Sequence, residues 1–273
     1  MKKRNLLPGL LITISTCLTL NANAQLGGLW QKAKDKAAQK AGETIDKSTD
    51  KPSDGSSSAP HKSNRAVVNS AFDYVSGDSV IYSEDFSKYG VGTSPTSFKT
   101  NGAGSVVTVN GEPGKWLALQ DNATYKFTRQ LFYPKHFTME FDILASADQI
   151  SDIYPVCFGF ATDNSVRDYT NTTGAYVNLL YYNNNQVNVG NSKTNKYVNG
   201  TFDLSTDANR PMHVSIVVDG DRMVVYLDKT KMADTQLFTP TDAKNFYISG
   251  PIQYKNGSKI LISNLKIAKF KNG

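Results

Sequence analysis

Two acidic side chains on one face of a predicted strand are the residues best suited to chemistry in this chain. Residues 137 to 145 alternate between apolar and polar types, which predicts a half-buried strand with Glu140 and Asp142 on its polar face. Two neighbouring carboxylates could take part in the cleavage of a glycosidic bond. They could also form an exposed polar face or coordinate a metal ion. We therefore treat both as candidate ligand-binding residues.

A second group of candidate ligand-binding residues lies in the stretch from Ala175 to Asn185. If this stretch is a strand with Ala175 facing the core, then Tyr176, Asn178 and Tyr182 share the other face. Aromatic rings can stack on the C-H faces of sugars, and amides can bond to their hydroxyl groups. The sequence therefore predicts a sugar-binding face here, although the strand propensity of tyrosine explains the same residues without a ligand.

The remaining residue types that support catalysis are not arranged in diagnostic motifs. His61, His136 and His213 lie in a linker, before a strand and on a strand, and none is near a Gly-x-Ser-x-Gly motif. No cluster of Cys and His has the spacing of a zinc site. We expect no catalytic residue and no cofactor; calcium is the alternative at Asp163-Asn164 and at residues 219 to 221, which lack a diagnostic spacing.

The elements that position these residues are predicted to be strands. From about Val67 onward, short apolar or alternating segments are separated by turn signals such as Asn110-Gly111, Asp219-Gly220 and Asn256-Gly257. The clearest element is a hairpin over residues 214 to 228 with Asp219-Gly220 in its turn. About a dozen short strands without a long helical segment predict an all-β, two-sheet antiparallel sandwich, because two apolar faces must bury each other.

The first 64 residues predict three segments before the sandwich. Basic residues, an apolar run and the pattern Ala22-Asn23-Ala24 predict a signal peptide over residues 1–24, and Cys17 in the apolar run is a weak candidate for lipidation. Residues 25–49 predict an amphipathic helix whose lysines and Trp30 could contact a membrane surface through residues 26–47. Residues 50–64 predict a flexible linker, which leaves residues 65–273 for the sandwich.

Charge and cysteine content exclude two classes of protein. The chain has a formal net charge of +6, but residues 65 to 273 contain twenty basic and nineteen acidic residues, so we expect no nucleic-acid partner. After removal of the predicted signal peptide, Cys157 is the one remaining cysteine, so the mature chain cannot form an internal disulfide. Its apolar neighbours predict that Cys157 packs as a small hydrophobic residue.

Several segments together resemble the concanavalin A-like or laminin G-like jelly roll. They are residues 80–87, the Gly114-Lys-Trp-Leu117 strand, residues 134–143, the hairpin and the ending Ile260-Leu-Ile-Ser-Asn-Leu-Lys-Ile267. The chain is also similar to the module that precedes outer-membrane-protein-A-like domains in Gram-negative envelope proteins. These resemblances imply a jelly-roll sandwich at the cell envelope and say less about its activity.

The laminarinase-like glycosidases of this fold class use the strand pattern Glu-x-Asp-x-x-Glu. Glu140 and Asp142 match its first two positions, but Ala145 stands where the last carboxylate belongs. Retaining hydrolysis needs two carboxyl groups about 5 Å apart, one as nucleophile and one as acid. The resemblance therefore implies a protein that binds sugars rather than one that cleaves them.

The sequence leads to an exported, non-catalytic sandwich protein of the periplasm, the outer membrane or the extracellular space. We expect it to bind a glycan or another envelope component, including an envelope protein. A glycoside hydrolase or polysaccharide lyase with an atypical site is the first alternative, and a structural assembly subunit is the second.

Overall fold

The computed structural model describes residues 72–183 and 186–271. The predicted signal peptide with Cys17, the amphipathic helix, the linker with His61, and residues 65–71 of the predicted sandwich lie outside the described residues. Within the described ranges, no helix has the length and apolar character needed to cross a membrane.

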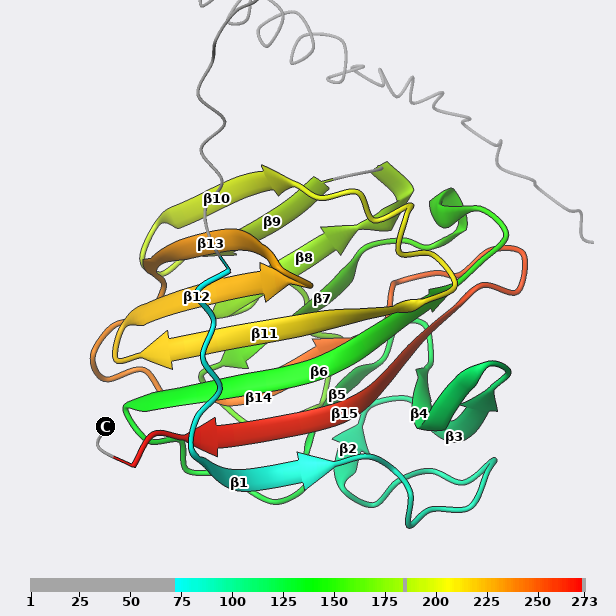
Figure 1. Ribbon diagram of the computed structural model, residues 1–273, viewed down its shortest axis with the longest axis horizontal. Coiled ribbons are helices and arrows are strands. Elements are labelled where there is room, and N and C mark those ends of the chain that lie inside the picture. Colours follow the sequence, from blue (N-terminus) through cyan, green and yellow to red (C-terminus); the bar gives the residue numbers. More distant parts are fainter. Residues whose placement is uncertain (1–71, 184–185, 272–273) are drawn as a thin grey trace, which may run out of the picture. The chain divides into compact units, whose positions relative to one another are not determined.

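The described residues form two antiparallel sheets, which we call the front and back sheets after their places in Figure 1. The front sheet has eight strands in the order β13-β12-β11-β6-β15-β4-β3, with β1 paired to β15. Its strands are β1 (Ser79–Glu84), β3 (Gly104–Val109), β4 (Glu112–Leu119), β6 (His136–Ser146), β11 (Pro211–Asp219), β12 (Arg222–Leu227), β13 (Thr230–Gln236) and β15 (Lys259–Lys269).

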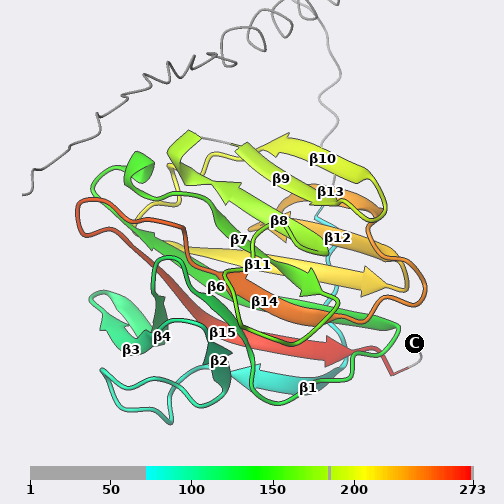
Figure 2. The ribbon, with the colours of Figure 1, turned by 180° about the vertical axis from the view of Figure 1, so that it is seen from behind.

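The back sheet has seven strands in the order β10-β9-β8-β7-β14-β5-β2, seen from its own side in Figure 2. Its strands are β2 (Phe98–Thr100), β5 (Thr124–Phe127), β7 (Val156–Ala161), β8 (Ala175–Leu180), β9 (Gln186–Asn191), β10 (Lys196–Thr201) and β14 (Asn245–Ser249). Two short 3-10 helices, η1 (Ile150–Asp152) and η2 (Tyr181–Asn183), connect strands. The two sheets confirm the predicted all-β jelly-roll sandwich.

The core lies between the sheets and is built from every second side chain of the strands, those that point inward. On β6 the predicted apolar face is buried, with Phe137, Met139 and Phe141 at 0% exposure. Phe141 of the front sheet meets Phe158 of the back sheet edge to face, with ring centroids 5.2 Å apart. Burying such aromatic side chains between two sheets supplies the main driving force for this fold.

The predicted hairpin is confirmed as β11 and β12, with Gly220 at a φ of 61° in its turn. The stretch that begins at Ala175 is a strand only as far as Leu180, where β8 stops, so the prediction that Tyr182 belongs to this strand is wrong, because Tyr182 lies in η2. The sequence also gave no sign of β2, β10 or β13. Each lies at a sheet edge, and β10, which is largely exposed, and β13, which is partly buried, have no regular apolar alternation.

Candidate functional site

The outer face of the front sheet carries a cluster of four charged side chains. Glu140 and Asp142 come from β6, and the pairing with β11 places His213 directly opposite Asp142. On the other side, a bulge in β15 at Asn264, whose φ is 55°, brings Lys266 opposite Glu140. Without the extra residue of the bulge, Ser263 and Lys266 would face opposite sides of the sheet.

Short contacts connect the members of this charged cluster. His213 Nδ1 lies 2.6 Å from Asp142 Oδ1, and His213 Nε2 lies 3.6 Å from Glu140 Oε2. Lys266 Nζ lies 3.1 Å from Glu140 Oε1, and Asn264 donates a hydrogen bond of 2.7 Å to Asp142 Oδ2. Each carboxylate therefore has two partners in the neighbouring strands.

These contacts set the protonation of two groups. Hydrogen bonds to Asp142 and then to Glu140 raise the pKa of His213 to about 9, so its ring is an imidazolium at neutral pH. Burial favours the neutral form of Glu140, but its contacts, first with His213 and then with Ser76 and Lys266, hold the pKa of this carboxyl well below its usual value. Glu140 is therefore ionised and stays so far into the acid range.

A strap, residues 72–77, crosses the outer face of the front sheet over this cluster (Figure 1). Its Asp73 accepts hydrogen bonds from Tyr226 at 2.8 Å and from Lys231 at 2.7 Å. Further along, Ser76 donates to Glu140 Oε1 at 2.5 Å, and the backbone N-H of Gly77 donates to Thr138. The strap is thus fixed to β12, β13 and β6.

A hollow of about 700 Å³ opens beside the strap, and we call it the Glu140 hollow. Its lining combines aromatic rings, charged groups and hydroxyls. They are Phe72, Tyr74 and Phe202; Glu140, Arg210, His213, Asp228 and Lys229; and Ser215 and Thr230.

Two side chains in the lining of the hollow, Ser215 and Tyr74, have hydroxyls without a hydrogen-bond partner among the described residues. Ser215 lies opposite Glu140 on β11 and has 0% exposure, and its Oγ has no partner among the described residues. A buried hydroxyl without a partner costs about 1 to 3 kcal/mol of stability. Ser215 therefore carries hydrogen-bonding capacity that no described residue uses.

The glycosidase pattern fails in three dimensions as well as in sequence. Ala145 belongs to the core at 2% exposure, so its position faces away from Glu140 and Asp142. A carboxylate at this point of β6 would face the core rather than the hollow. Of the two candidate residues, Glu140 lines the hollow, whereas Asp142 acts through His213.

The tyrosine group lies elsewhere. Tyr176 and Asn178 are on the outer face of the back sheet, which is the opposite side of the sandwich from Glu140. Tyr182 leaves this face, and in η2 its ring stacks on Tyr154 with centroids 5.9 Å apart. The expected trio of Tyr176, Asn178 and Tyr182 is therefore not one surface.

The proposed calcium loops have other contacts. Asp163 accepts hydrogen bonds from the backbone N-H and the hydroxyl of Ser165, and Asp219 is the strand-register partner of Arg222 at the turn of the β11–β12 hairpin. Among the described residues, no three His, Cys, Asp or Glu side chains are grouped to hold a metal ion. Cys157 is buried as predicted, and this burial raises its pKa to about 11.

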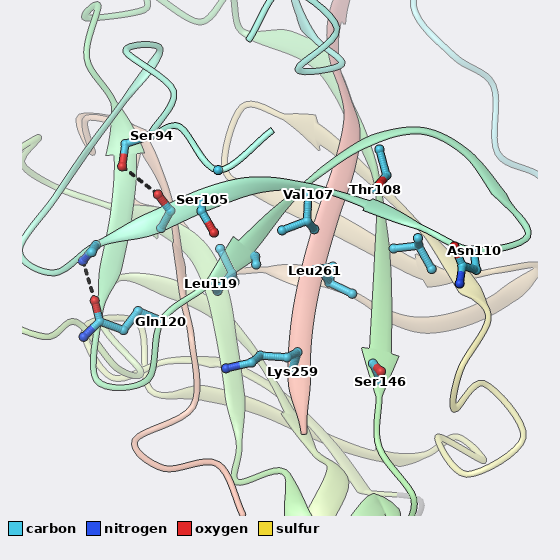
Figure 3. A pocket seen from close by; sticks show the side chains of 15 residues that line it. Ser94, Ser105, Val107, Thr108, Asn110, Leu119, Gln120, Ser146, Lys259 and Leu261 are labelled. Carbon is cyan, nitrogen blue, oxygen red and sulfur yellow. Dashed lines mark hydrogen bonds between the residues drawn. The ribbon is translucent and has the colours of Figure 1, made fainter. Parts of the chain in front are cut away.

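A second hollow, of about 770 Å³, lies between β3, β4 and β15 (Figure 3). Its floor includes Val107, Leu119 and Leu261, and Lys259 is the one charged residue among those that line it. Ser94 and Gln120 already bond to backbone groups, at 2.7 Å and 2.6 Å. No aromatic ring lines this hollow, so it is a weaker candidate than the Glu140 hollow for binding a sugar.

Several residues of the Glu140 hollow were not singled out from the sequence. His213 was assigned only to a strand, and Ser215, Phe72, Tyr74 and Phe202 were not noted. The signal for His213 was available, because aligning the predicted hairpin beside the strand from Phe137 places an imidazole next to a carboxylate. The strap and the bulge at Asn264 carried no comparable signal.

Comparisons with known proteins find similar solved structures but do not assign the chain to a family. No family model and no curated protein matches the chain. Among solved structures it is similar to arcelin-5, a lectin-like defence protein from Phaseolus vulgaris, at 12% identity over 68% of this chain and 96% of that one, with a TM-score of 0.48. It is also similar to the exoplasmic/lumenal domain of VIP36, at 12% identity over 69% and 91%, with a TM-score of 0.49.

A third similar structure is a sialidase, at 17% identity over 72% of this chain, with a TM-score of 0.47. The chain spans about a fifth (19%) of the length of that protein. These likenesses do not assign the chain to a family, and its fold class rests on the two sheets themselves.

Proposed function

We propose that this protein is a non-catalytic glycan-binding sandwich and that the Glu140 hollow holds one sugar unit of its ligand. The observation that carries the proposal is the composition of the hollow. It combines aromatic rings with polar groups, namely ionised side chains and the hydroxyls of Ser215 and Tyr74, which have no partner among the described residues. Sugar units need these two kinds of contact together, since they have apolar C-H faces and many hydroxyl groups.

The charge of the hollow favours a neutral ligand. Glu140 and Asp228 offset two of the three cationic residues in the lining, and Asp142 bonds to His213. At the rim, Arg210 pairs with Asp207 and lies 3.7 Å from Asp228. Charged groups that already pair with one another can still accept or donate hydrogen bonds to hydroxyls, and they create no strong attraction for an ion.

The residues of the hollow are better suited to binding a glycan than to cleaving one. Glu140 is ionised and bonded to Ser76 and Lys266, so it does not supply a proton near neutral pH. His213 is protonated and cannot act as a base for Ser215, whose hydroxyl has no hydrogen bond to it. The residues that line the hollow thus lack a working acid and base pair.

The test is a calorimetric titration of the full chain with neutral oligosaccharides of glucose, mannose, galactose, xylose and N-acetylglucosamine. We expect at least one to bind and expect Phe72→Ala to weaken it about fivefold or more, because one stacking face is lost. Phe132→Ala is the matched control, since Phe132 is 89% exposed and lies outside the hollow. Equal affinities of the two variants would contradict the assignment of the hollow.

The same preparations should be assayed for release of reducing ends from mixed polysaccharides. We expect none above background. Release that is abolished by Glu140→Gln would overturn the non-catalytic proposal and favour a hydrolase, because it would make Glu140 part of the chemistry.

Export to the cell envelope belongs to the same proposal. Its support is the sequence of residues 1–24, with cleavage after Ala24. N-terminal sequencing of the protein recovered from fractionated cells should begin at Gln25 in the envelope or extracellular fraction. A cytoplasmic protein that retains Met1 would contradict export.

A further inference from the structure

We infer that the outer face of the back sheet over β8, β9 and β10 binds a second segment of neutral glycan, laid flat across the strands. This surface, the Tyr-Asn face, consists of Tyr176, Asn178, Asn188, Gly190, Tyr197 and Asn199. It lies on the opposite side of the sandwich from the Glu140 hollow, so it is a separate site whose binding does not depend on that hollow.

Strand register places these residues in two parallel rows. Tyr176 of β8 lies opposite Gly190 of β9, which lies opposite Tyr197 of β10. In the next outward row, Asn178 lies opposite Asn188, which lies opposite Asn199. Adjacent strands are about 4.8 Å apart, so each row spans about 10 Å across the sheet. Figure 2 shows the three strands side by side at one edge of the back sheet.

The glycine lets the two rings share one surface. A Cβ atom at Gly190 would lie 2.7 Å from Cδ1 of Tyr197 and 3.1 Å from the hydroxyl oxygen of Tyr176. Both tyrosines therefore reach over the backbone of β9. Tyr197 is 53% exposed, and burial together with the neighbouring Tyr197 raises the pKa of Tyr176. The result is an aromatic surface that includes part of the glycine backbone.

The asparagine row supplies directed polar groups. Asn188 donates a hydrogen bond of 2.6 Å to the side-chain oxygen of Asn199, which orients these two amides. The side-chain oxygen of Asn178 is buried and has no partner among the described residues. An amide with two donors and one acceptor can bond to vicinal hydroxyl groups of a sugar.

The chain itself restricts this surface to three strands. The loop of residues 162–174 covers the neighbouring part of the back sheet, where Thr170 bonds to Thr124 and to Ser249. Tyr169 of the loop bonds to Gly250, and Tyr247 bonds to Thr173. Cys157 and Tyr247 beneath the loop have 0% exposure. Beyond the loop, Tyr197 and Asn199 are exposed, and Tyr176, Asn178 and Asn188 are partly exposed.

The chemistry of the face selects one class of ligand. None of its six residues carries a charge at neutral pH, so the face complements an uncharged partner and offers nothing to a polyanion. Stacking surface and amides in adjacent rows suit linked sugar units better than a purely apolar partner. A protein with this site and the Glu140 hollow would contact glycan on both sides and could cross-link two chains.

The test uses the full chain, the oligosaccharide panel named above, and NMR detection of side-chain amides. For a bound oligosaccharide, the amide signals of Asn178, Asn188 and Asn199 should shift with a common dissociation constant. The double variant Tyr176→Ala, Tyr197→Ala should weaken this binding about tenfold or more. Tyr182→Ala is the matched control, because Tyr182 is exposed and lies outside the face.

Asn199→Ala gives a second variant that leaves the tyrosines in place, and because Asn199 is exposed we expect it to fold normally. It should weaken the same binding about threefold or more. Binding that survives both variants, or that shifts no asparagine amide, would overturn the inference. So would an absence of binding combined with self-association that Tyr197→Ala abolishes, since that would assign the face to a second protein copy. Phe72→Ala should leave glycan binding at the Tyr-Asn face unchanged. A failure of this inference can therefore be told apart from a failure of the proposal for the Glu140 hollow.

Discussion

The two outer faces of the sandwich cover the same core but present opposite surfaces. On the front sheet, His213 and Lys266 each pair with Glu140 beneath a strap, and Glu140 and His213 line a hollow. On the back sheet, the Tyr-Asn face is uncharged and partly exposed. A pleated sheet can therefore present either an enclosed site with fixed groups or a more open one with repeated groups, depending on which loops cross it.

The largest expected effect is the loss of Glu140, which tests whether the front face depends on its charges. Glu140→Ala leaves His213 and Lys266 without their shared carboxylate, whose side chain is 13% exposed. We expect a loss of about 3 kcal/mol in the free energy of unfolding, measured with urea. Asp148→Ala is the control, because Asp148 is an exposed carboxylate. If both variants lose the same free energy of unfolding, the paired charges of the front face do not stabilise the fold as described.

The back face should instead respond to steric change. Gly190→Ala places a methyl group 2.7 Å from the ring of Tyr197, and we expect it to destabilise the fold by about 1 to 3 kcal/mol. Gly90→Ala is the matched control, since its nearest neighbour would be Thr93 at 3.4 Å. If the two variants have the same midpoint temperature of thermal unfolding, Tyr197 does not lie over Gly190 as described.

The contrast also shows what the sequence could predict. The alternation from Phe137 to Ala145 indicated β6, its buried face and its outward carboxylates, because a half-buried strand has a strict period of two. The outward position of Tyr176 and Asn178 followed from the same rule. These predictions needed no knowledge of neighbouring strands.

The rest depended on pairing between distant segments. Tyr197 and Asn199 were missed because β10 is a largely exposed edge strand without apolar alternation, and Tyr182 was misplaced because β8 ends in a 3-10 helix. The strap and the bulge at Asn264 are set by contacts with other strands, such as Ser76 with Glu140. Such long-range contacts leave no periodic pattern in the chain.

A pH titration tests the front face separately, because His213 belongs to the front face alone. Its pKa is raised from 6.5 to about 9, so its stabilising contribution is complete below pH 6.5 and is lost as the pH rises through 9. We expect the free energy of unfolding to fall over this range and expect His213→Gln to reduce the fall. NMR titration of the imidazole gives the pKa directly, and a value near 6.5 would contradict the described contacts.

The smallest effect on stability is expected at Ser215. Ser215→Ala removes an unpartnered hydroxyl, so the free energy of unfolding should stay constant or rise by about 1 kcal/mol while sugar binding weakens. Ser263→Ala is the matched buried control, because its Oγ donates to Lys115 at 2.6 Å and its loss should destabilise by about 1 kcal/mol. A stability loss at Ser215 similar to that at Ser263 would mean that its hydroxyl has a partner.

The most direct test of the central claim, that this sandwich binds neutral glycan at the Glu140 hollow, is one NMR titration of the full chain with the oligosaccharide panel. We expect at least one oligosaccharide to shift the imidazole signals of His213 in a saturable manner, and we expect Phe72→Ala to weaken this response. If no member of the panel moves the signals of His213, or if the response is the same in Phe72→Ala, the claim is contradicted.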